Sequence, residues 1–208
     1  MQIFICGDST AASYNAEETQ MVGWGQVLGE YLPGTGVVNL AMAGRSTKTF
    51  LAEGRLQPAE EQGRPGDLLL VQFAHNDENE KKPERYTAPQ TEFKENLRFF
   101  IRFARERNMV PVLLTPICMR IWQDGELQPT HGEYPGAMRD VAEELDVPLV
   151  DLYEDSFRIV KSAGEEGSRD LFIYTAAGGD PDNAHTRRAG AERFAEAAAQ
   201  GLKALGLV

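Results

Sequence analysis

Residues 2–10, QIFICGDST, carry the strongest single indication of the fold of this chain. Its first half, Gln2–Cys6, is a short apolar run, which is typical of a strand buried on both faces of a sheet. The chain then changes at once to the turn-forming residues of GDST. A serine on a tight turn after a buried strand is where α/β enzymes expose reactive groups. The stretch therefore predicts an α/β protein in which Ser9 is a candidate reactive residue.

Further apolar runs of strand length follow, and helix-like patterns lie between them. Strands without apolar–polar alternation, separated by helices, are typical of a parallel sheet that is covered on both faces. We therefore predict a three-layer α/β/α sandwich with a sheet of about five parallel strands, built as a single domain over residues 1–208. The predicted strands are Gln2–Cys6, Gly36–Leu40, Asp67–Phe73, Val110–Thr115 and Pro148–Asp151, and the predicted helices are Trp24–Leu32, Phe93–Arg107, Tyr134–Leu145 and Arg187–Leu205.

The composition is that of an ordinary globular domain. With 208 residues the chain is long enough to bury about 70% of its unfolded surface, and its hydrophobic fraction of 42% argues against disorder. The net charge of −11 disfavours nucleic acid and anionic membranes as partners, because both need concentrated Lys and Arg. Cys6 and Cys118 show no CxxC spacing and are expected to be buried free thiols.

No targeting, membrane or metal-binding pattern stands out in the chain. Met1-Gln2 leads straight into the first apolar run, without a basic leader or a cleavage site. The longest apolar stretches, such as Leu68–Ala74, are too short to cross a bilayer. We therefore expect a cytoplasmic protein. The histidines and cysteines are too dispersed for a metal site, so neither a metal nor another cofactor is expected. Nothing in the sequence indicates an oligomeric state.

Polar residues follow each of the first four predicted strands. Ligands of such sheets bind beyond the carboxyl ends of the strands, and these ends lie at one edge. The loop with Asp182 and His185, which precedes the last predicted helix, is able to fold back over the same rim. We therefore expect a site there. The converging segments are Gly7–Thr10, Ala41–Ser46, Ala74–Asp77 and Pro116–Arg120.

Ser9 needs a base before it can act as a nucleophile. His185 is the best candidate, because Asp182 precedes it by three residues and its carboxylate can accept the Nδ1–H of the ring. The two short motifs thus supply the hydroxyl, imidazole and carboxylate of a serine-hydrolase triad. The other histidines, His75 and His131, are interpreted as structural.

An ester hydrolase also needs donors for the oxyanion of its tetrahedral intermediate. Gly44 offers an unobstructed backbone N–H, because glycine lets a substrate approach closely. Asn76 offers a side-chain amide after the third predicted strand. Ser46 also follows an apolar run and is the rival nucleophile, although it lacks the position after the first strand that Ser9 has.

These residues resemble the four sequence blocks of the SGNH (GDSL) hydrolases, in their order and approximate separation. The resemblance covers nearly the whole chain and implies the flavodoxin-like fold of that superfamily and an acyl-ester hydrolase activity. It implies Ser9 as the nucleophile, His185 as the base and Asp182 as the carboxylate that orients the base. The oxyanion donors that it implies are the N–H groups of Ser9 and Gly44 and the side chain of Asn76.

A closer resemblance is to the rhamnogalacturonan acetylesterase branch, which removes acetyl groups from pectic sugars. It implies a serine esterase of pectin degradation whose substrates are acetylated rhamnogalacturonan oligosaccharides. One departure is Ala74, because the third block usually begins with glycine and a positive φ there would strain alanine. The stretches that carry the resemblance are GDST at 7–10, GWG at 23–25, QFAHND at 72–77, and TP at 115–116 with Arg120.

Other side chains are candidates for binding the sugar. Trp24 is placed either to stack on a sugar ring or to fill the core. Arg45, Lys48 and Arg120 either hold positive charge at the rim for uronate groups or are ordinary solvated charges. His75 lies in the third loop and is a candidate either to bind the substrate or to orient that loop.

The sequence leaves other functions open. Within the same superfamily they are an acetylxylan or general short-chain carbohydrate esterase, and a lipid or thioester hydrolase. Outside enzymes, the sheet would be a flavodoxin-like module in which Ser9, Thr10 and Ser13 cradle a phosphate, although the first loop lacks the extra glycine for this. A catalytically inactive carbohydrate-binding relative is the last alternative.

Overall fold

The computed structural model describes residues 1–174 and 182–208 of the chain. Its centre is a sheet of five strands in the order β2-β1-β3-β4-β7, and every neighbouring pair is parallel. Each of the predicted strand segments is present. The strands are β1 (Gln2–Gly7), β2 (Gly36–Asn39), β3 (Leu68–Gln72), β4 (Val110–Leu114) and β7 (Leu149–Val150).

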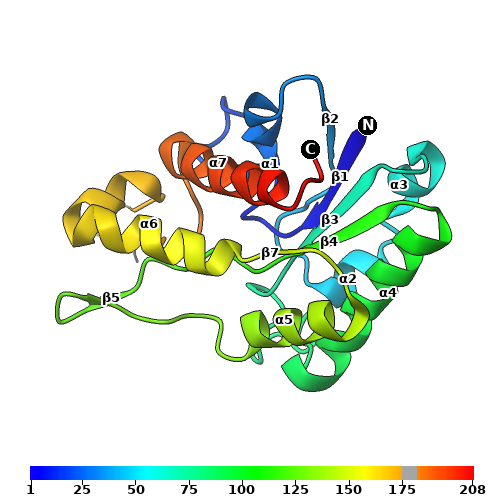
Figure 1. The fold of residues 1–208 in the computed structure, drawn as a ribbon. Coiled ribbons are helices and arrows are strands. Elements are labelled where there is room, and N and C mark those ends of the chain that lie inside the picture. The colour runs from blue at the N-terminus through cyan, green and yellow to red at the C-terminus, as the bar shows by residue number, and fades with distance from the viewer. Residues whose placement is uncertain (175–181) are drawn as a thin grey trace.

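Helices cover both faces of this sheet, which confirms the predicted three-layer sandwich (Figure 1). One face carries α1 (Trp24–Val27), the 3-10 turn η1 (Leu28–Tyr31), α6 (Leu152–Gly167), η3 (Ser168–Leu171) and α7 (Arg188–Ala204). The other face carries α2 (Thr47–Ala52), α3 (Gln57–Gln62), the π-turn η2 (Pro89–Phe93), α4 (Lys94–Glu106) and α5 (Tyr134–Leu145).

Strand β1 shows why the sheet needs both layers. Its side chains alternate between the faces: Ile3 and Ile5 pack in the core cluster of α1 and α7, and Phe4 and Cys6 pack in that of α4 and α5. All four have no exposed surface. Full burial of such a side chain contributes about 1.5–3 kcal/mol, so the unalternated apolar run is stable only between two layers.

The predicted helices are present, with differences at their ends. Tyr134–Leu145 forms α5 with the predicted bounds, and the two longer predicted helices are shorter by a residue or so at each end. The predicted Trp24–Leu32 divides into α1 and η1. Gly25 and Gly29 lower its helix propensity, which favours this division.

Helices α2, α3 and α6 and the hairpin β5 (Trp122–Gln123) and β6 (Glu126–Leu127) lie outside the predicted set. The first two have six residues each, too few to show a helical period. In α6 the backbone leaves the helical region at Gly164, which has φ 74°. The hairpin has a sequence signal, because Asp124-Gly125 both have positive φ, as its tight turn requires.

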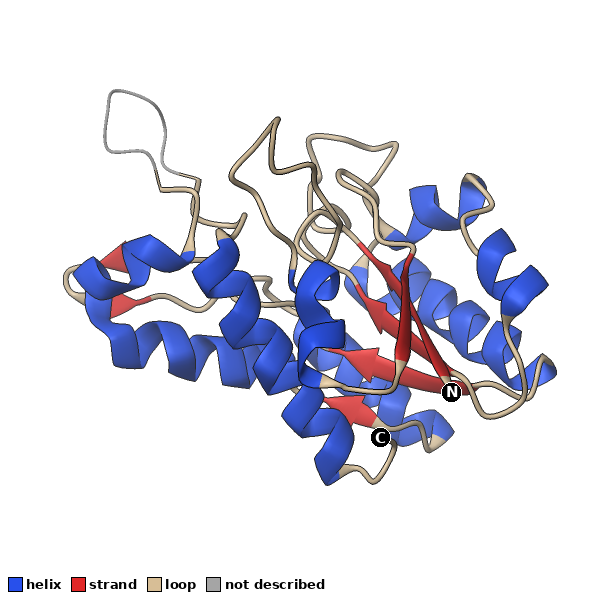
Figure 2. Ribbon diagram, turned by 90° about the horizontal axis from the view of Figure 1, so that it is seen from above, coloured by secondary structure: helices blue, strands red, loops and turns tan. Residues whose placement is uncertain are grey.

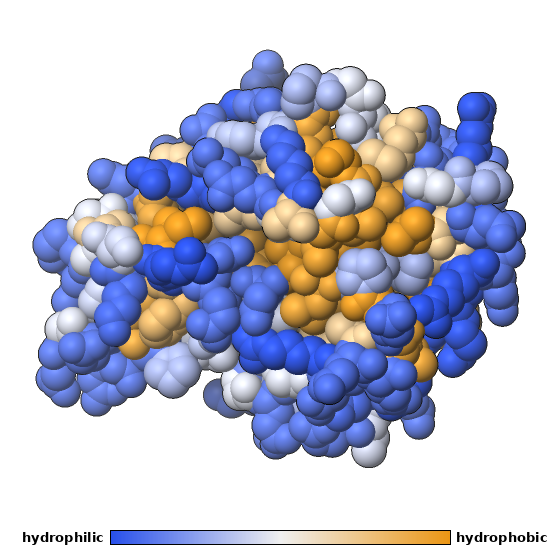
Figure 3. Space-filling view, in the orientation of Figure 1, coloured by the Kyte–Doolittle hydropathy of each residue, from blue (hydrophilic) through white to orange (hydrophobic). Residues whose placement is uncertain are grey.

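The long loops lie beyond the carboxyl ends of the strands, at the tips of the strand arrows in Figure 2. On the face seen in Figure 3, hydrophobic residues gather around β7, and hydrophilic residues surround them. No helix within the described residues combines the length and apolar character that a membrane span requires.

Candidate active site

Ser9 lies on the turn directly after β1, as the sequence predicts. The carboxylate of Asp8 shapes this turn, because its Oδ1 accepts the backbone N–H of Thr10 at 2.9 Å and the Thr10 hydroxyl at 2.8 Å. The N–H groups of Ala11 and Ala12 donate to the Asp8 carbonyl. The turn is therefore fixed on both sides of Ser9, whose residue surface is 8% exposed.

Trp24 supports the turn from inside the protein. The side chain is fully buried, and its Nε1–H donates to Oε1 of Gln72 at 3.0 Å, an oxygen that also accepts the Thr10 hydroxyl. Gly23 makes this approach possible, since a Cβ there would lie 2.3 Å from the Ala12 carbonyl oxygen. The prediction of Trp24 as a stacking platform for sugar is wrong, because a buried indole offers no face to a ligand.

His185 reaches Ser9 from the other end of the chain. Its Nε2 lies 2.9 Å from the Ser9 Oγ, and its Nδ1 lies 2.8 Å from Oδ2 of Asp182. An ionised carboxylate only accepts hydrogen bonds, so Nδ1 carries the ring proton and Nε2 is left to accept the serine proton. The structure thus brings three residues from opposite ends of the sequence into one hydrogen-bonded chain.

Asp182 holds the backbone of His185 as well as its ring. Its Oδ1 accepts the N–H groups of Ala184 at 3.1 Å and of His185 at 2.9 Å. Burial favours a higher pKa for Asp182, but the hydrogen bonds and charge of His185 outweigh burial and lower that pKa. The carboxylate is therefore ionised at neutral pH and stabilises an imidazolium at His185.

Backbone hydrogen bonds attach the Asp182–His185 loop to the rim of the sheet. The N–H of Arg120 donates to the carbonyl of Asn183 at 2.8 Å. The N–H of Val22 donates to the carbonyl of Thr186 at 2.9 Å, and the Thr186 hydroxyl donates back to the carbonyl of Val22. The position of His185 is thus set by loops that follow other elements of the fold.

The side chain of Arg120 is engaged away from this cleft. It is buried, its Nε donates to Oγ of Ser168 at 2.9 Å, and it also donates to the carbonyl of Glu165. Its guanidinium lies 5.1 Å from the ring centre of Tyr174. The prediction that Arg120 binds substrate is wrong, because these contacts use the side chain to anchor the end of α6.

The three residues predicted to supply oxyanion donors, Ser9, Gly44 and Asn76, line the same cleft. Within residues 1–174 and 182–208, the N–H groups of Ser9 and Gly44 have no hydrogen-bond acceptor. Gly44 has φ +77°, a conformation that side-chain-bearing residues rarely adopt. The Nδ2 of Asn76 donates to the carbonyl of Arg45 at 3.0 Å, which leaves its second N–H for a ligand.

One cleft of about 490 Å³ joins these groups. Its walls are made of small or flexible apolar side chains and of the polar groups described above. Such walls suit a short acyl group better than a long chain. The lining residues are Ser9, Met21, Ala43, Gly44, His75, Asn76, Arg85, Met119, Ala184 and His185.

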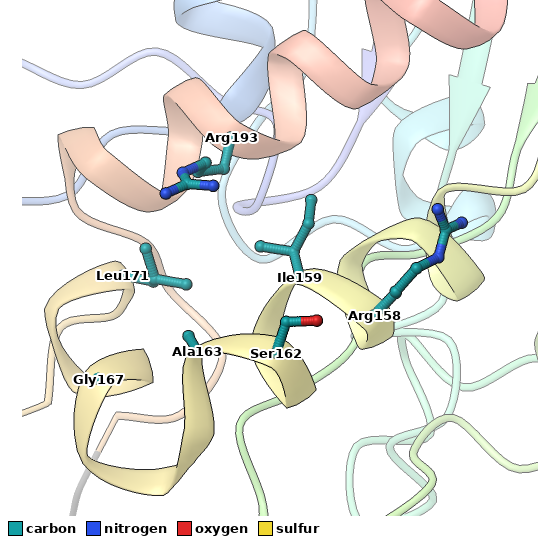
Figure 4. A pocket seen from close by; sticks show the side chains of 7 residues that line it. All are labelled: Arg158, Ile159, Ser162, Ala163, Gly167, Leu171 and Arg193. Carbon is teal, nitrogen blue, oxygen red and sulfur yellow. The ribbon is translucent and has the colours of Figure 1, made fainter.

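A separate hollow of about 410 Å³ lies between α6 and α7 (Figure 4). Ile159 of α6 and Arg193 of α7 lie on its two sides. The described residues that line it include Ser162 but neither a carboxylate nor an imidazole that could act as a base for nucleophilic chemistry. The groups of a hydrolase therefore meet in the Ser9 cleft.

The rim cations that were candidates for uronate groups pair with acidic residues. Arg45 has its Nε 3.0 Å from the Glu53 carboxylate, and its Nη1 donates to the carbonyl of Ala43 at 2.9 Å. Lys48 has its Nζ 3.3 Å from Glu92. Neither side chain lines the cleft. The structure thus does not bring Arg45 to the position of a substrate contact.

Ser46 is the N-cap of α2 and is fully buried. Its Oγ accepts the N–H of Thr49 at 3.3 Å, and its own N–H donates to the Thr49 hydroxyl at 2.9 Å. These reciprocal bonds form a capping box, which is a structural role. No base contacts Ser46 among the described residues, so the rival nucleophile is excluded.

His75 and His131 belong to a buried network beside the cleft. The Nδ1 of His75 lies 3.4 Å from Oδ2 of Asp8, and the two imidazole rings pack edge to face with their centres 4.3 Å apart. His131 in turn contacts Glu78 at 3.0 Å and the carbonyl of Ile117 at 2.9 Å. The network joins the Ser9 turn to the third loop. His75 also lines the cleft.

Ala74 has φ 156°, at the edge of the positive region that glycine enters freely. The residue is fully buried and packs in the core cluster of α4 and α5. Alanine therefore occupies the usual glycine position of the third block with a backbone close to the extended region.

Arg85 and Met21 line the cleft without having been predicted, and Met119 was predicted only as part of the converging segment Pro116–Arg120. Arg85 lies on the long loop after β3, so the rule of carboxyl strand ends includes it. Its neighbours along the chain are also charged, however, and the pattern gave no reason to select it. The methionines lie on loops that are far apart in sequence, and only the fold brings them together.

The amino-acid sequence of residues 5–193 matches the GDSL-like Lipase/Acylhydrolase family. The chain belongs to this family. This confirms the resemblance that the sequence blocks carry, and it agrees with the position of Ser9 in a GDS turn. As in the predicted order of blocks, the GDSL-like hydrolase described here places its serine first and its histidine last.

Two relatives of this GDSL-like hydrolase come from Bacillus subtilis strain 168. The probable rhamnogalacturonan acetylesterase YesY is 40% identical over 206 residues, which cover 99% of this chain and 94% of YesY. The rhamnogalacturonan acetylesterase RhgT is 39% identical over 216 residues, which cover 100% of this chain and 91% of RhgT.

Solved structures confirm the predicted fold. The crystal structure of YxiM from Bacillus subtilis superposes with a TM-score of 0.85 at 30% identity, over 99% of this chain and 56% of that one. Axe2, an acetylxylan esterase from Geobacillus stearothermophilus, superposes with a TM-score of 0.71 at 17% identity, over 97% of this chain and 93% of that one. The second likeness concerns the fold alone.

Proposed function

We propose that this GDSL-family hydrolase is a serine esterase that removes acetyl groups from acetylated rhamnogalacturonan oligosaccharides. The observation that carries the chemistry is the hydrogen-bonded chain from Asp182 through His185 to the Ser9 Oγ, at 2.8 and 2.9 Å. The substrate is proposed from the names of YesY and RhgT, which align over nearly all of this chain.

The reaction is a double displacement. The Ser9 Oγ attacks the acetyl carbonyl carbon while Nε2 of His185 takes the hydroxyl proton. The negative oxygen of the tetrahedral intermediate accepts hydrogen bonds from the N–H groups of Ser9 and Gly44 and from the Asn76 amide. The bond to the sugar oxygen then breaks, and His185 gives its proton to that oxygen.

The acetyl group is now on Ser9. A water molecule attacks its carbonyl carbon, and His185 takes a proton from the water. When the second tetrahedral intermediate collapses, acetate leaves and the proton returns to the Ser9 Oγ. Asp182 remains ionised throughout and stabilises the imidazolium that forms in each half of the cycle.

The second candidate is an acetylxylan esterase or a general short-chain carbohydrate esterase. It uses the same residues and the same cleft, and the fold of Axe2 agrees with it. A lipid hydrolase is less well supported, because the apolar side chains that line the cleft of about 490 Å³ are those of Met21, Ala43, Met119 and Ala184, which form a short apolar surface for a long acyl chain. The preformed contact between His185 and Ser9 disfavours an inactive binding module.

A substrate panel tests the proposal. Acetate release is measured from acetylated rhamnogalacturonan oligosaccharides, from acetylated xylo-oligosaccharides, and from 4-nitrophenyl esters of increasing acyl length. We expect the highest kcat/KM on the pectic oligosaccharides and a fall with acyl length. Equal or higher kcat/KM on the xylo-oligosaccharides would favour the second candidate, and a rise with acyl length would contradict both.

Matched serine variants test the nucleophile in the same panel. Ser9→Ala is expected to remove acetate release, whereas Ser162→Ala, an exposed serine at the α6–α7 hollow, is expected to keep it. We also propose a cytoplasmic location. Recovery of the activity in the cytosolic fraction of fractionated cells supports this location, and recovery in the medium contradicts it.

A further inference from the structure

Arg85 contacts both loops that supply the second and third oxyanion donors. Its Nη1 donates to Oδ1 of Asn76 at 3.2 Å. Its guanidinium also lies over Gly44, since a Cβ built on that glycine would be 3.4 Å from Nη1 and 3.7 Å from Cζ. The same side chain lines the cleft of Ser9. Neither the sequence blocks nor the proposed mechanism assigns Arg85 a role.

The contacts of Asn76 fix which end of its amide faces the cleft. Its Nδ2 donates to the carbonyl of Arg45, which only accepts, and its Oδ1 accepts from Arg85, which only donates. If the amide rotated by half a turn, oxygen would face oxygen and nitrogen would face nitrogen. With Arg85 present, the second N–H of Asn76 is therefore kept as a donor for the oxyanion.

The loop that carries Arg85 is itself fixed to the third loop. The N–H of Thr87 donates to the carbonyl of Asp77 at 3.1 Å, and the Thr87 hydroxyl donates to the Asp77 carboxylate at 2.8 Å. The N–H of Arg85 closes a turn onto the carbonyl of Lys82 at 2.9 Å. These bonds place the guanidinium without help from a ligand.

Among residues 1–174 and 182–208, no acidic side chain engages the charge of Arg85 strongly. Its acidic contact is Glu84, at 3.9 Å, with a side chain that is 65% exposed. A pair this exposed and this long contributes little. By contrast, Arg45 and Arg55 both contact Glu53 at hydrogen-bond distance. The guanidinium is therefore free to act on Asn76.

We propose that Arg85 is a positioning residue of the oxyanion hole, which orients the Asn76 amide so that its N–H points toward the developing negative charge. This proposal rests on the esterase function proposed above. Arg85 acts through Asn76 and does not contact the reacting atoms. Its planar fork over Gly44 distinguishes it from a lysine, which offers a single point of charge.

The expected effect follows from the difference between ground state and transition state. The oxyanion exists only after Ser9 attacks, so a misoriented Asn76 lowers kcat and leaves KM nearly unchanged. Loss of an oxyanion donor costs about 10²–10³-fold in kcat, so we expect Arg85→Ala to lower kcat by about 10- to 100-fold.

The experiment is a double-mutant cycle with 4-nitrophenyl acetate, a neutral substrate, and with acetylated rhamnogalacturonan oligosaccharides. The variants are Arg85→Ala, Arg85→Lys, Asn76→Ala and Arg85→Ala with Asn76→Ala. Lys82→Ala is the matched control, because Lys82 is an exposed cation of the same loop. Thermal unfolding of each variant confirms that it folds.

We expect Arg85→Ala to lower kcat equally on both substrates, with Arg85→Lys intermediate and Lys82→Ala unchanged. In the Asn76→Ala background, Arg85→Ala is expected to change kcat by less than about threefold, because the residue through which it acts is gone. Additive losses of kcat in the cycle would overturn the proposal.

A different pattern would also overturn it. If Arg85→Ala raised KM for the acidic oligosaccharide and left the neutral substrate unaffected, Arg85 would be a binding site for uronate rather than a positioning residue. Ser9→Ala, measured in parallel, distinguishes failure of the Arg85 proposal from failure of the esterase mechanism. If Ser9→Ala kept full turnover, the esterase mechanism itself would fail, whatever the cycle showed.

Discussion

Two Asp–His pairs flank Ser9, and they differ in burial and in what the imidazole faces. His185 and Asp182 lie 2.8 Å apart on the last loop, with side chains 30% and 34% exposed. His75 and Asp8 lie 3.4 Å apart between the first and third loops, with side chains 7% and 0% exposed. The first imidazole contacts the Ser9 Oγ, and the second packs against another imidazole.

The two pairs show that an Asp and a His have different roles, depending on whether the histidine is accessible to the Ser9 hydroxyl and to substrate. The half-exposed pair leaves Nε2 of its histidine open to the serine hydroxyl and to substrate. In the buried pair, the two nitrogens of His75 have, among the described residues, no hydrogen-bond partner apart from the nearby Asp8 carboxylate. Its contribution is to tie the Ser9 turn to the loop of Asn76. The following predictions test this division, in order of expected effect.

The largest effect is expected from removal of the open histidine. His185→Ala should lower kcat/KM for 4-nitrophenyl acetate by about 10⁵-fold or more, because no other base contacts the Ser9 hydroxyl in the part of the chain that the structure describes. The midpoint of urea unfolding should change little, since the side chain is part-exposed. If His75→Gln caused the larger loss of kcat at unchanged stability, the catalytic role would belong to the His75–Asp8 pair and not to the His185–Asp182 pair.

Asp182→Asn should give the next largest effect. An amide can donate to Nδ1 and thereby favour the wrong tautomer of His185, and it cannot stabilise the imidazolium. We expect kcat to fall by about 10³–10⁴-fold with KM nearly unchanged. The structure-matched control is Asp155→Asn, an acid of α6 far from the Ser9 cleft. A loss below tenfold would show that the open pair does not need its carboxylate.

His75→Gln should mainly lower stability. Breaking a buried ion pair costs about 3–5 kcal/mol, and at a separation of 3.4 Å we expect about 2–4 kcal/mol, measured by urea unfolding. Because the variant also loosens the contact between two loops of the site, a smaller fall in kcat accompanies it. Unchanged stability would show that the buried pair does not hold the loops together.

The cost of His75→Gln should depend on pH. Burial favours a lower pKa for His75 and a higher one for Asp8, but each charge outweighs burial for its partner, so the His75 pKa is raised and the Asp8 pKa is lowered. The contribution of the Asp8 charge is present above its ordinary pKa of 3.8, and that of His75 below its ordinary pKa of 6.5.

The pair therefore stabilises the protein most between these two values. Its contribution falls as pH drops through the lowered pKa of Asp8 or rises through the raised pKa of His75. Burial also raises the pKa of Asp77 from 3.8 to about 7, so wild-type stability also falls as the pH rises between these two values. The difference in unfolding free energy between wild type and His75→Gln, measured at pH 5.5 and at pH 8.5, largely removes the contribution of Asp77. An equal difference at the two pH values would contradict the ion-pair interpretation.

The smallest effect is expected at an exposed pair of similar length. Lys48 and Glu92 are separated by 3.3 Å, and their side chains are 41% and 43% exposed. Lys48→Ala should lower the free energy of unfolding by less than about 0.5 kcal/mol and leave kcat unchanged. A loss as large as that of His75→Gln would show that burial is not what separates strong from weak pairs in this protein.

Local sequence patterns are enough to predict the layers of the fold and the identity of the reacting groups. An apolar run without polar alternation, such as Leu68–Gln72, must be buried on both faces of the sheet. The local sequence is enough to show this requirement. The Ser9 turn and the Asp182–His185 spacing are local as well. The short helix α2, whose Ser46 cap was interpreted as a rival nucleophile, shows the limit, because six residues carry too little periodicity.

The contacts of each side chain at the rim depend on how distant loops pack together, and they could not be predicted from the sequence. The sequence predicts sugar contacts at Trp24, Arg45 and Arg120. In the structure, the side chains of these residues bind instead to Gln72, Glu53 and Ser168, respectively. Arg85 carried no signal and lies against Asn76. Burial and hydrogen-bond partners are set by loops that are far apart in the chain, and no local pattern encodes them. The packing of these loops also determines that His185 contacts the Ser9 hydroxyl and that His75 is buried away from it.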